Sequence, residues 1–229
     1  MRLTNYFIKK KVQSLASGAA GRKHEFCALE DAGHILVLYQ ANDRELVEPC
    51  LDVLRKKNKK VPCGDILLGS NDAGLVIADW THGHHYGDVM KRLGRYLKNP
   101  EFVPGHHPVN ERAAEELAEY FDGKRKDFDL PVIYYGTEFQ KKVWRVLEAV
   151  PYATTTTYRE LAMRLGMPQS ARAVGAAVGL NPFAVIVPCH RVLGTDGSLT
   201  GYDGGFAAKK FLLAHEMPER FPLETELPL

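Results

Sequence analysis

The chain has 229 residues, of which 45% are hydrophobic and 25% are charged, and its formal net charge at pH 7 is +2. These values are ordinary for a soluble globular protein with a sizeable core in one or two domains. No apolar run approaches the ~18 residues of a transmembrane helix, so we expect no such helix. Residues 1–11 are basic but lack the apolar core and cleavage site of a secretory signal.

The four cysteines are widely spaced and form no CxxC pair; they are Cys27, Cys50, Cys63 and Cys189. Such spacing favours a reducing, intracellular compartment over a secreted disulfide framework. We therefore expect a cytoplasmic protein, or a nuclear one if the host is a eukaryote.

The small net charge hides segments of opposite sign. Residues 1–60 carry 12 Lys and Arg against 7 Asp and Glu, residues 61–136 carry 8 against 12, and residues 137–195 carry 7 against 3. The last excess suits a polyanionic partner, although a solvated charged face is the usual explanation. The pattern of elements predicts a basic N-terminal extension of unassigned role at 1–60. It also predicts a small α+β subdomain with connector at 61–136 and a mainly helical domain at 137–229.

The N-terminal 60 residues contain two expected elements. The run 34–39 is typical of a strand, and 43–60 is typical of a helix with one apolar face. The helix ends in the basic run 56–60. That run could contact nucleic acid, but a solvated helix end favoured by the macrodipole is the commoner case.

A β-hairpin is expected next. The apolar runs 65–69 and 75–80 are separated by Asn-Asp-Ala-Gly, which is typical of a turn. Histidines follow within 82–85 and at 106–107. Their spacing matches no standard set of ligands, so we expect no metal site.

Five helices are predicted in the rest of the chain from their caps and apolar stripes. They cover residues 110–121, 138–149, 158–165, 170–180 and 206–214. The expected N-caps are Asn110, Thr137 and Thr157, and Glu160 completes a capping box with Thr157. The third and fourth helices flank a tight turn at 166–168, which is a helix-turn-helix signature.

The helix at 170–180 is built almost entirely from Ala, Gly and Val, and Arg172 is its one large polar side chain. Close packing inside the protein is the common reason for small residues. A helix pressed into a DNA groove, with Arg172 as its long probe, would have the same composition. Reading base edges needs Asn, Gln, Arg or Lys. Their scarcity favours binding that ignores sequence and deforms the duplex.

The candidate reactive stretch is Val-Ile-Val-Pro-Cys-His-Arg-Val at 185–192. Its β-branched run predicts a short buried strand that ends at Pro188 and carries Cys189 at its end. A neighbouring His or Arg lowers the pKa of a thiol and favours the thiolate, although a free cysteine is more often inert. Glu216 could return to His190 and complete a Glu–His–Cys chain. Such a nucleophile would suit a base flipped out of its stack.

Four short motifs carry a family resemblance. They are Asn181-Pro182, Pro188-Cys-His-Arg191, Ala171-Arg-Ala-Val-Gly175 and Ala214-His-Glu216. With them the chain resembles the O6-alkylguanine-DNA alkyltransferases, also called methylated-DNA–protein-cysteine methyltransferases, over residues 61–216 and most strongly from residue 139. The resemblance implies an α+β fold. A small α/β-roll subdomain is followed by a mainly helical, winged helix-turn-helix-like domain that carries the cysteine.

The resemblance also implies a reaction. The protein would flip O6-alkylguanine out of duplex DNA and transfer the alkyl group irreversibly to its own Cys189, once per molecule and without a cofactor. Its partner would be double-stranded DNA, bound in the minor groove with little sequence specificity by a monomer.

By the same resemblance, Cys189 is the acceptor, His190 its base through a water, and Glu216 the group that orients His190. Asn181 braces the turn before the cysteine. The DNA contacts come from Arg172, which replaces the flipped nucleotide, and from Tyr158, Ala171, Ala173 and Gly175. The substrate contacts come from Tyr158, Val178, Tyr202, Asp203 and Gly204.

The chain departs from the family pattern in several places. Residues 1–60 have no counterpart in the short members, and no zinc-binding spacing is recognisable. Asp203 stands where a small neutral residue is common, and we expect its carboxylate near the base. Ala153 replaces a glycine that is usual in its turn. Gly204 and Gly205 are expected to leave the pocket mouth open to substituents larger than methyl.

Three other functions fit less well. A non-catalytic alkyltransferase-like lesion-binding protein, the main alternative, lacks the acceptor cysteine that this chain has. A helix-turn-helix regulator needs polar recognition residues. A cysteine hydrolase needs a Cys and a His from separate elements, whereas neighbours on an extended segment point to opposite faces.

Overall fold

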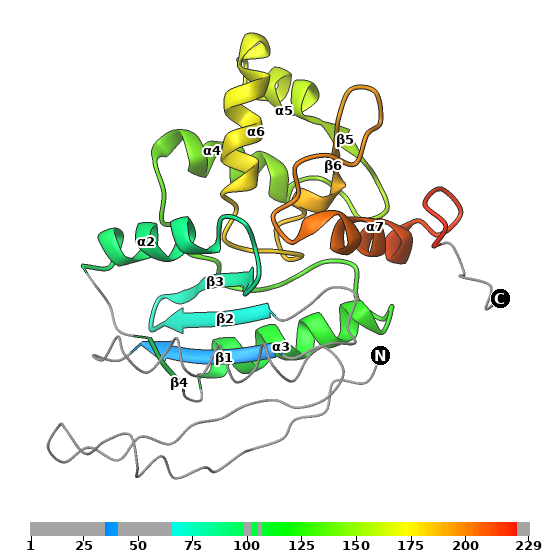
Figure 1. Cartoon of the computed structure of the whole chain (residues 1–229). Coiled ribbons are helices and arrows are strands. Elements are labelled where there is room, and N and C mark those ends of the chain that lie inside the picture. Colours follow the sequence, from blue (N-terminus) through cyan, green and yellow to red (C-terminus); the bar gives the residue numbers. More distant parts are fainter. Residues whose placement is uncertain (1–34, 41–65, 99–101, 105–106, 224–229) are drawn as a thin grey trace, which may run out of the picture.

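The computed structural model describes residues 35–40, 66–98, 102–104 and 107–223. They form a four-stranded sheet with helices packed on it and, after a connector, a mostly helical unit (Figure 1). The α+β fold class predicted from the sequence is confirmed. The helix predicted at 43–60, with the basic run that ends it, lies outside the described residues.

The sheet has the strand order β3-β2-β1-β4. Its strands are β1 (Ile35–Gln40), β2 (Ile66–Asn71), β3 (Gly74–Trp80) and β4 (Phe102–Pro104). β2 and β3 form the predicted antiparallel hairpin, and Oδ1 of Asn71 accepts the backbone N–H of Ala73 (3.0 Å) inside its turn. β1 runs parallel to β2. The sheet therefore includes a strand from the N-terminal 60 residues.

Both faces of the hairpin are apolar, because β2 and β3 are covered by a helix on each side. Neighbouring side chains of a strand point to opposite faces. Leu67 packs with Val89 of α2 (Tyr86–Tyr96) on one face. Leu68 shares the larger core with Leu117 of α3 (Pro108–Phe121) on the other.

α3 begins two residues earlier than the sequence predicted. Pro108 takes the first helical position, where its missing N–H costs nothing, and the side chain of His107 accepts the N–H of Val109. Asn110, the predicted cap, is buried inside the helix. Gly123 follows the helix end with a φ of 74°, as a residue past the C-cap should.

The helical unit contains α4 (Glu138–Glu148), α5 (Tyr158–Arg164), α6 (Ala171–Gly179), α7 (Gly205–Glu216) and the short parallel pair β5 (Thr156–Thr157) and β6 (Val192–Leu193). The capping boxes at Thr137 and Thr157 are both present. α5 and α6 form the predicted helix-turn-helix. None of the helices in the described part of the chain is long and apolar enough to cross a membrane.

The predicted strand at 185–187 was wrong. Val185 has a φ of 69°, and the backbone N–H of Val187 donates to the carbonyl of Phe183 (2.9 Å), which closes a tight turn. The cysteine begins a 3₁₀ turn, Cys189–Arg191. The β-branched residues are present because the segment is enclosed on all sides, with Val185 and Val187 fully buried. Periodicity cannot separate that situation from a buried strand.

The outer edge of β3 joins the two units. The N–H of Leu75 donates to the carbonyl of Pro131 (2.8 Å), and the N–H of Ile133 returns a bond to Leu75. Further along, the N–H of Ala78 donates to Pro182, and Ala78 accepts from Ala184. An edge strand that would otherwise be open is thus covered. The segment just before the cysteine is held on the sheet.

The backbone of Ala153 lies in the left-handed region, with a φ of 55°. A residue with a Cβ costs about 1–2 kcal/mol there, whereas glycine does not. We expect Ala153→Gly to raise the free energy of unfolding by about 0.5–1 kcal/mol, less than the full strain because glycine is more flexible when unfolded. Urea denaturation measures this. The matched control Ala149→Gly, at a φ of −77°, should instead destabilise. A less stable Ala153→Gly variant would contradict the strain.

Candidate active site

The carboxylate of Glu216, at the end of α7, is the meeting point of the site. It accepts hydrogen bonds from Nε2 of His190 (2.8 Å), the hydroxyl of Tyr120 (2.8 Å) and the N–H of Ala153 (3.1 Å). Arg191 adds Nε (2.9 Å) and Nη2 (2.9 Å). The side chains of Glu216 and His190 are completely buried. The contact between these two residues that the sequence predicted is present.

The charges in this cluster are well defined. Burial alone would raise the pKa of Glu216, but hydrogen bonds and charges from His190 and Arg191 outweigh it and hold the pKa well below its usual range. Burial lowers the pKa of His190, although Glu216 opposes this. At neutral pH the carboxylate is therefore ionised and the imidazole is neutral.

The hydrogen-bond network assigns the imidazole tautomer. Nε2 of His190 faces a carboxylate, so Nε2 carries the proton and donates it. Nδ1 is then the basic nitrogen. It is buried and has no hydrogen-bond partner among the described residues. The site thus holds a neutral base, fixed from behind by Glu216.

The thiol of Cys189 lies in the same buried region, and the residue is 8% exposed. Nδ2 of Asn181 lies 3.2 Å from Sγ and 2.9 Å from the carbonyl of Val187, while Oδ1 accepts the N–H of Phe183 (3.1 Å). One amide therefore braces the turn, as expected, and also offers a donor to the sulfur.

The thiol is not activated at rest. Burial raises the pKa of Cys189 to about 12, although the hydrogen bond from Asn181 opposes this. The sequence led us to expect a lowered pKa from His190 and Arg191, and this was wrong. Both side chains are directed at Glu216 instead. The sulfur can only react after its proton has been removed.

The first turn of α6 carries the predicted DNA-binding side chains. Arg172 and Ala173 are exposed, whereas Ala171 and Gly175 are half-buried. Arg172 makes no hydrogen bond or ion pair within the part of the chain that the structure describes. Val178, on the opposite face, is 1% exposed and belongs to the core.

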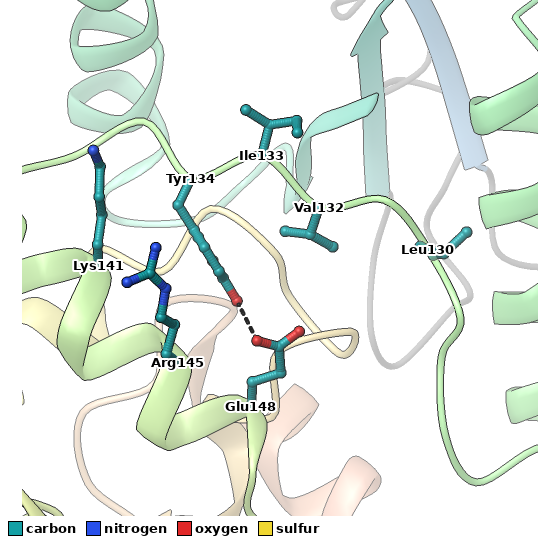
Figure 2. Close-up of a pocket in the computed structure, with 7 residues that line it drawn as sticks. All are labelled: Leu130, Val132, Ile133, Tyr134, Lys141, Arg145 and Glu148. Carbon is teal, nitrogen blue, oxygen red and sulfur yellow. Dashed lines mark hydrogen bonds between the residues drawn. The ribbon is translucent and has the colours of Figure 1, made fainter. Parts of the chain in front are cut away.

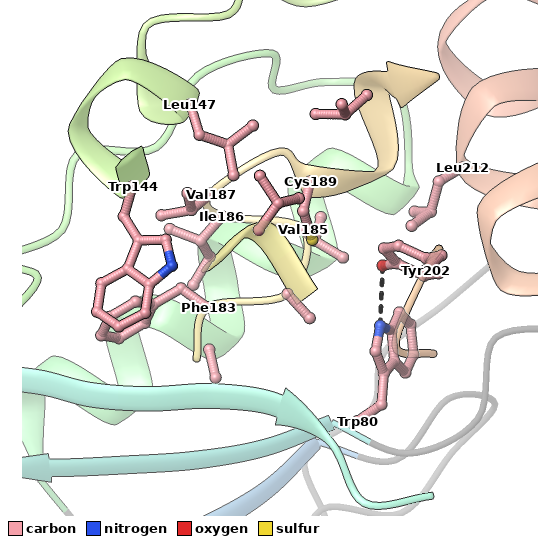
Figure 3. Close-up of a cluster of buried hydrophobic side chains, with 14 of the residues drawn as sticks. Trp80, Trp144, Leu147, Phe183, Val185, Ile186, Val187, Cys189, Tyr202 and Leu212 are labelled. Carbon is pink, nitrogen blue, oxygen red and sulfur yellow. Dashed lines mark hydrogen bonds between the residues drawn. The ribbon is translucent and has the colours of Figure 1, made fainter. Parts of the chain in front are cut away.

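The predicted substrate residues lie around a loop that leads into α7. The hydroxyl of Tyr158 donates to the carbonyl of Thr200 (3.1 Å), and the hydroxyl of Tyr202 accepts Nε1–H of Trp80 (2.9 Å; Figure 3). A Cβ at Gly204 would lie 2.5 Å from the Trp80 ring, whereas one at Gly205 would meet nothing within 4 Å. The size of the substituent that the pocket admits stays a prediction. The carboxylate of Asp203 is turned toward the start of α2.

Comparison with known proteins identifies the family. Residues 138–218 match the family described as "6-O-methylguanine DNA methyltransferase, DNA binding domain". The chain is 43% identical over 155 residues to the methylated-DNA–protein-cysteine methyltransferase of Methanosarcina barkeri, covering 68% of this chain and 92% of that protein. It is 51% identical over 158 residues to that of Mycolicibacterium paratuberculosis, covering 68% and 87%. The chain belongs to the methylated-DNA–protein-cysteine methyltransferase family.

The fold agrees with this membership. The crystal structure of Mycobacterium tuberculosis OGT in complex with DNA is similar, with a TM-score of 0.58 and 30% identity over 79% of this chain and 93% of that one. The enzyme class predicted from the sequence, a protein-cysteine methyltransferase of DNA repair, is confirmed. DNA as a binding partner is confirmed as well, because the matched segment is a DNA binding domain.

Two buried ionisable side chains that act on the Cys189 thiol, Lys209 and Asp79, were missed. Lys209 is fully buried in α7, and its Nζ donates to the carbonyls of Val192 (2.5 Å) and Thr200 (2.7 Å). Burial lowers the pKa of Lys209 to about 8, and the group lies close enough to Cys189 to favour its thiolate. A signal existed, since Lys209 stands seven residues before Glu216, on the inner face of α7.

Asp79 was also missed. It interrupts the apolar β3 at 1% exposure, and burial together with the charge of Asp203 raises the pKa of its carboxyl well above the usual range. The carboxyl is therefore held toward its neutral form.

A surface hollow lies away from this site, between the connector and α4 (Figure 2). It is lined by Leu130, Val132, Ile133, Tyr134, Lys141, Arg145 and Glu148. None of the predicted site residues lines it, so it belongs to a different surface of the methyltransferase. Within the described ranges, no three His, Cys, Asp or Glu side chains are grouped to hold a metal ion.

We expect Glu216→Gln to lower the free energy of unfolding by about 3–5 kcal/mol at pH 7, because Arg191 then stays buried without its counter-charge. The pKa of Glu216 in the unfolded chain is about 4.3, and its pKa in the folded protein is lower. Its contribution is therefore complete above about pH 5 and is lost as the pH falls through the folded pKa.

Urea denaturation of parent and variant between pH 3 and pH 7 measures both effects. The difference between the two proteins should shrink below about pH 4. Tyr120→Phe removes one neutral donor to the same carboxylate and serves as the control, with an expected loss of about 1 kcal/mol. A difference that stays constant with pH would show that Glu216 is not ionised in the folded protein.

Proposed function

We propose that this methyltransferase repairs O6-alkylguanine in double-stranded DNA by accepting the alkyl group on Cys189, once per molecule. The observation that carries the proposal is a buried thiol followed directly in the chain by a buried imidazole, whose Nε2 is held by Glu216 and whose Nδ1 has no partner among the described residues. This arrangement supplies an acceptor and a base. A thioether has no built-in reversal, so the protein is consumed.

The bonds change in one displacement. The sulfur of Cys189 attacks the alkyl carbon, the new S–C bond forms, and the O6–C bond breaks with its electron pair left on the guanine. Nδ1 of His190 takes the thiol proton, directly or through one water, and that proton finally restores the neutral guanine. Atoms and charge balance without a cofactor.

The residues around Glu216 favour the transfer of the thiol proton to His190. A thiol with a pKa of about 12 exposes almost no thiolate at neutral pH. Glu216 stabilises the imidazolium that forms when His190 accepts the proton. The amide of Asn181 and the ammonium of Lys209 stabilise the sulfur anion at the same moment. These fixed groups therefore stabilise the charges that appear on His190 and on the sulfur only during the reaction.

The substrate has to reach the thiol from outside the duplex stack. We propose that α6 enters the minor groove with its small-residue face, and that Arg172 fills the place of the flipped base. The exposed Arg172 and Ala173, at the first turn of α6, support this placement. Little base-edge contact is possible for Ala and Gly, so binding depends weakly on sequence. The monomeric state and the cytoplasmic or nuclear location stay predictions.

Mass spectrometry tests the proposed reaction. After incubation with duplex DNA containing O6-methylguanine, the peptide with Cys189 should gain one methylene, and the DNA should contain guanine. Binding of the modified DNA without any mass gain would instead identify an alkyltransferase-like lesion-binding protein.

Cys189→Ala should abolish alkyl transfer, because no other group of the site can form the S–C bond. Its affinity for DNA should stay within about twofold of the parent, since the exposed first turn of α6, with Arg172 and Ala173, is unchanged. Label transfer from alkyl-labelled DNA and a fluorescence binding assay measure the two quantities. Label on any other residue of this variant would refute the assignment.

Arg172→Ala should slow repair of duplex DNA sharply. Unstacking a base costs a few kcal/mol, and the arginine that offsets this cost is removed. Reaction with the free base O6-benzylguanine should change much less, because no flipping is needed. Single-turnover rates with both substrates give the comparison. Equal losses on the two would rule out the role of Arg172 in flipping.

A further inference from the structure

Three successive residues of the loop before α7 are each tied to the sheet unit. We call Tyr202–Gly204 the pocket loop and Trp80–His85, which joins β3 to α2, the tether. The two segments are about 120 residues apart in the chain. Each residue of the pocket loop has at least one partner in the tether.

The first and last ties are hydrogen bonds at the two ends of the pocket loop. Nε1–H of Trp80 donates to the hydroxyl of Tyr202 (2.9 Å) inside the protein. Nε2 of His82 lies 3.3 Å from the carbonyl of Gly204. Gly204 itself packs under the indole of Trp80, with no room for a side chain.

The central tie uses both the backbone and the side chain of Asp203. Oδ1 accepts the N–H of His85 at 2.6 Å, and the carbonyl accepts the N–H of His84 at 3.3 Å. Oδ2 lies against Gly83, where an added Cβ would be 2.0 Å away. The glycine therefore permits the carboxylate to approach the tether backbone directly.

The partner of this carboxylate is a helix end. His85 is the N-cap residue of α2, and its own side chain makes no capping bond. An acceptor from elsewhere in the chain satisfies its backbone N–H, and a negative charge there is favoured by the helix dipole. Burial raises the pKa of Asp203, while the N–H of His85 opposes the rise.

We propose that Asp203 is a positioning residue that latches the pocket loop to the start of α2, so that the sheet unit sets the shape of the alkyl pocket. The proposal rests on the proposed function of Cys189. It reverses the role expected from the sequence, in which the carboxylate of Asp203 faced the base.

The latch acts on the acceptor through Tyr202. Tyr202 is 7% exposed and shares the core that surrounds Cys189. Figure 3 shows its hydroxyl bonded to Trp80 and its side chain next to the segment that carries Cys189. A loop held at three successive residues cannot drift as a whole. Loss of the Asp203 carboxylate leaves only the backbone bond from His84 and the ties at Tyr202 and Gly204 to hold the wall of the pocket.

The test compares Asp203→Ala, which removes the acceptor, with Asp203→Asn, which keeps an oxygen for the N–H of His85. Asp196→Ala is the matched control, since the side chain of that aspartate accepts hydrogen bonds from Ser198 in the preceding turn. The readouts are the single-turnover rate with free O6-benzylguanine, the rate with O6-methylguanine in duplex DNA, DNA affinity and thermal stability.

We expect Asp203→Ala to slow both reactions about tenfold, because small displacements of a positioned group are costly to reaction rate. Asp203→Asn should recover most of the rate, and Asp196→Ala should match the parent. DNA affinity should be unchanged throughout. Parental rates in Asp203→Ala, or rates as low in Asp203→Asn as in Asp203→Ala, would overturn the proposal.

A second variant keeps the test decisive if Asp203→Ala folds poorly. Gly83→Ala places a Cβ where Oδ2 of Asp203 lies, so it should displace the carboxylate and slow transfer by a similar factor. In the double variant with Asp203→Ala the clash is gone, and the two losses should not multiply. Multiplying losses would mean that Gly83 and Asp203 act separately, against the latch.

The failure of the latch and the failure of the proposed function can be told apart. If the parent protein gains no methylene on Cys189, the proposed function fails. If the parent is alkylated but Asp203→Ala reacts at the same rate, only the latch fails.

Discussion

A single buried carboxylate, Glu216, joins three separate segments of the chain behind His190. Its two oxygens accept hydrogen bonds from α3, from the turn at Ala153 and from the 3₁₀ turn that begins at Cys189. Burial of a charge is costly unless it is paired and fully hydrogen-bonded. The fold meets this requirement by bringing donors from segments far apart in the chain. The same contacts that make the charge tolerable also fix the imidazole of His190, so stability and chemistry share one network.

The acceptor cysteine is placed by the boundary between the two units. Ala78 on the edge of β3 pairs with the backbone on both sides of Phe183, and Asn181 then holds the turn that leads to Cys189. The sulfur is therefore positioned from the sheet as well as from the helical unit. This explains how a thiol can sit on an irregular segment and still be fixed, since irregular backbone needs partners for all its polar groups. In a β-strand, the backbone hydrogen bonds to neighbouring strands would have supplied these partners.

The resting electrostatics suit a protein that reacts once. Burial keeps the thiol protonated, and Glu216 and Arg191 compensate each other's charge. A permanent thiolate would react with any soft electrophile, and one such event would end the protein's function. A protonated sulfur with a neutral base nearby responds instead to an electrophile held in place. The selectivity then comes from positioning, which the helix-turn-helix and the pocket loop supply.

Sequence alone determined the local features, and tertiary structure decided the rest. The capping boxes at Thr137 and Thr157 and the hairpin around Asn71 were predictable, because their partners lie within four residues. The family motifs also identified Cys189, His190 and Glu216 as candidates. The turn in place of a strand before Cys189 and the orientation of Asp203 toward α2 were not predictable. Both depend on backbone groups contributed by the sheet unit, more than 100 residues away, and no local pattern records which distant N–H or carbonyl will be near.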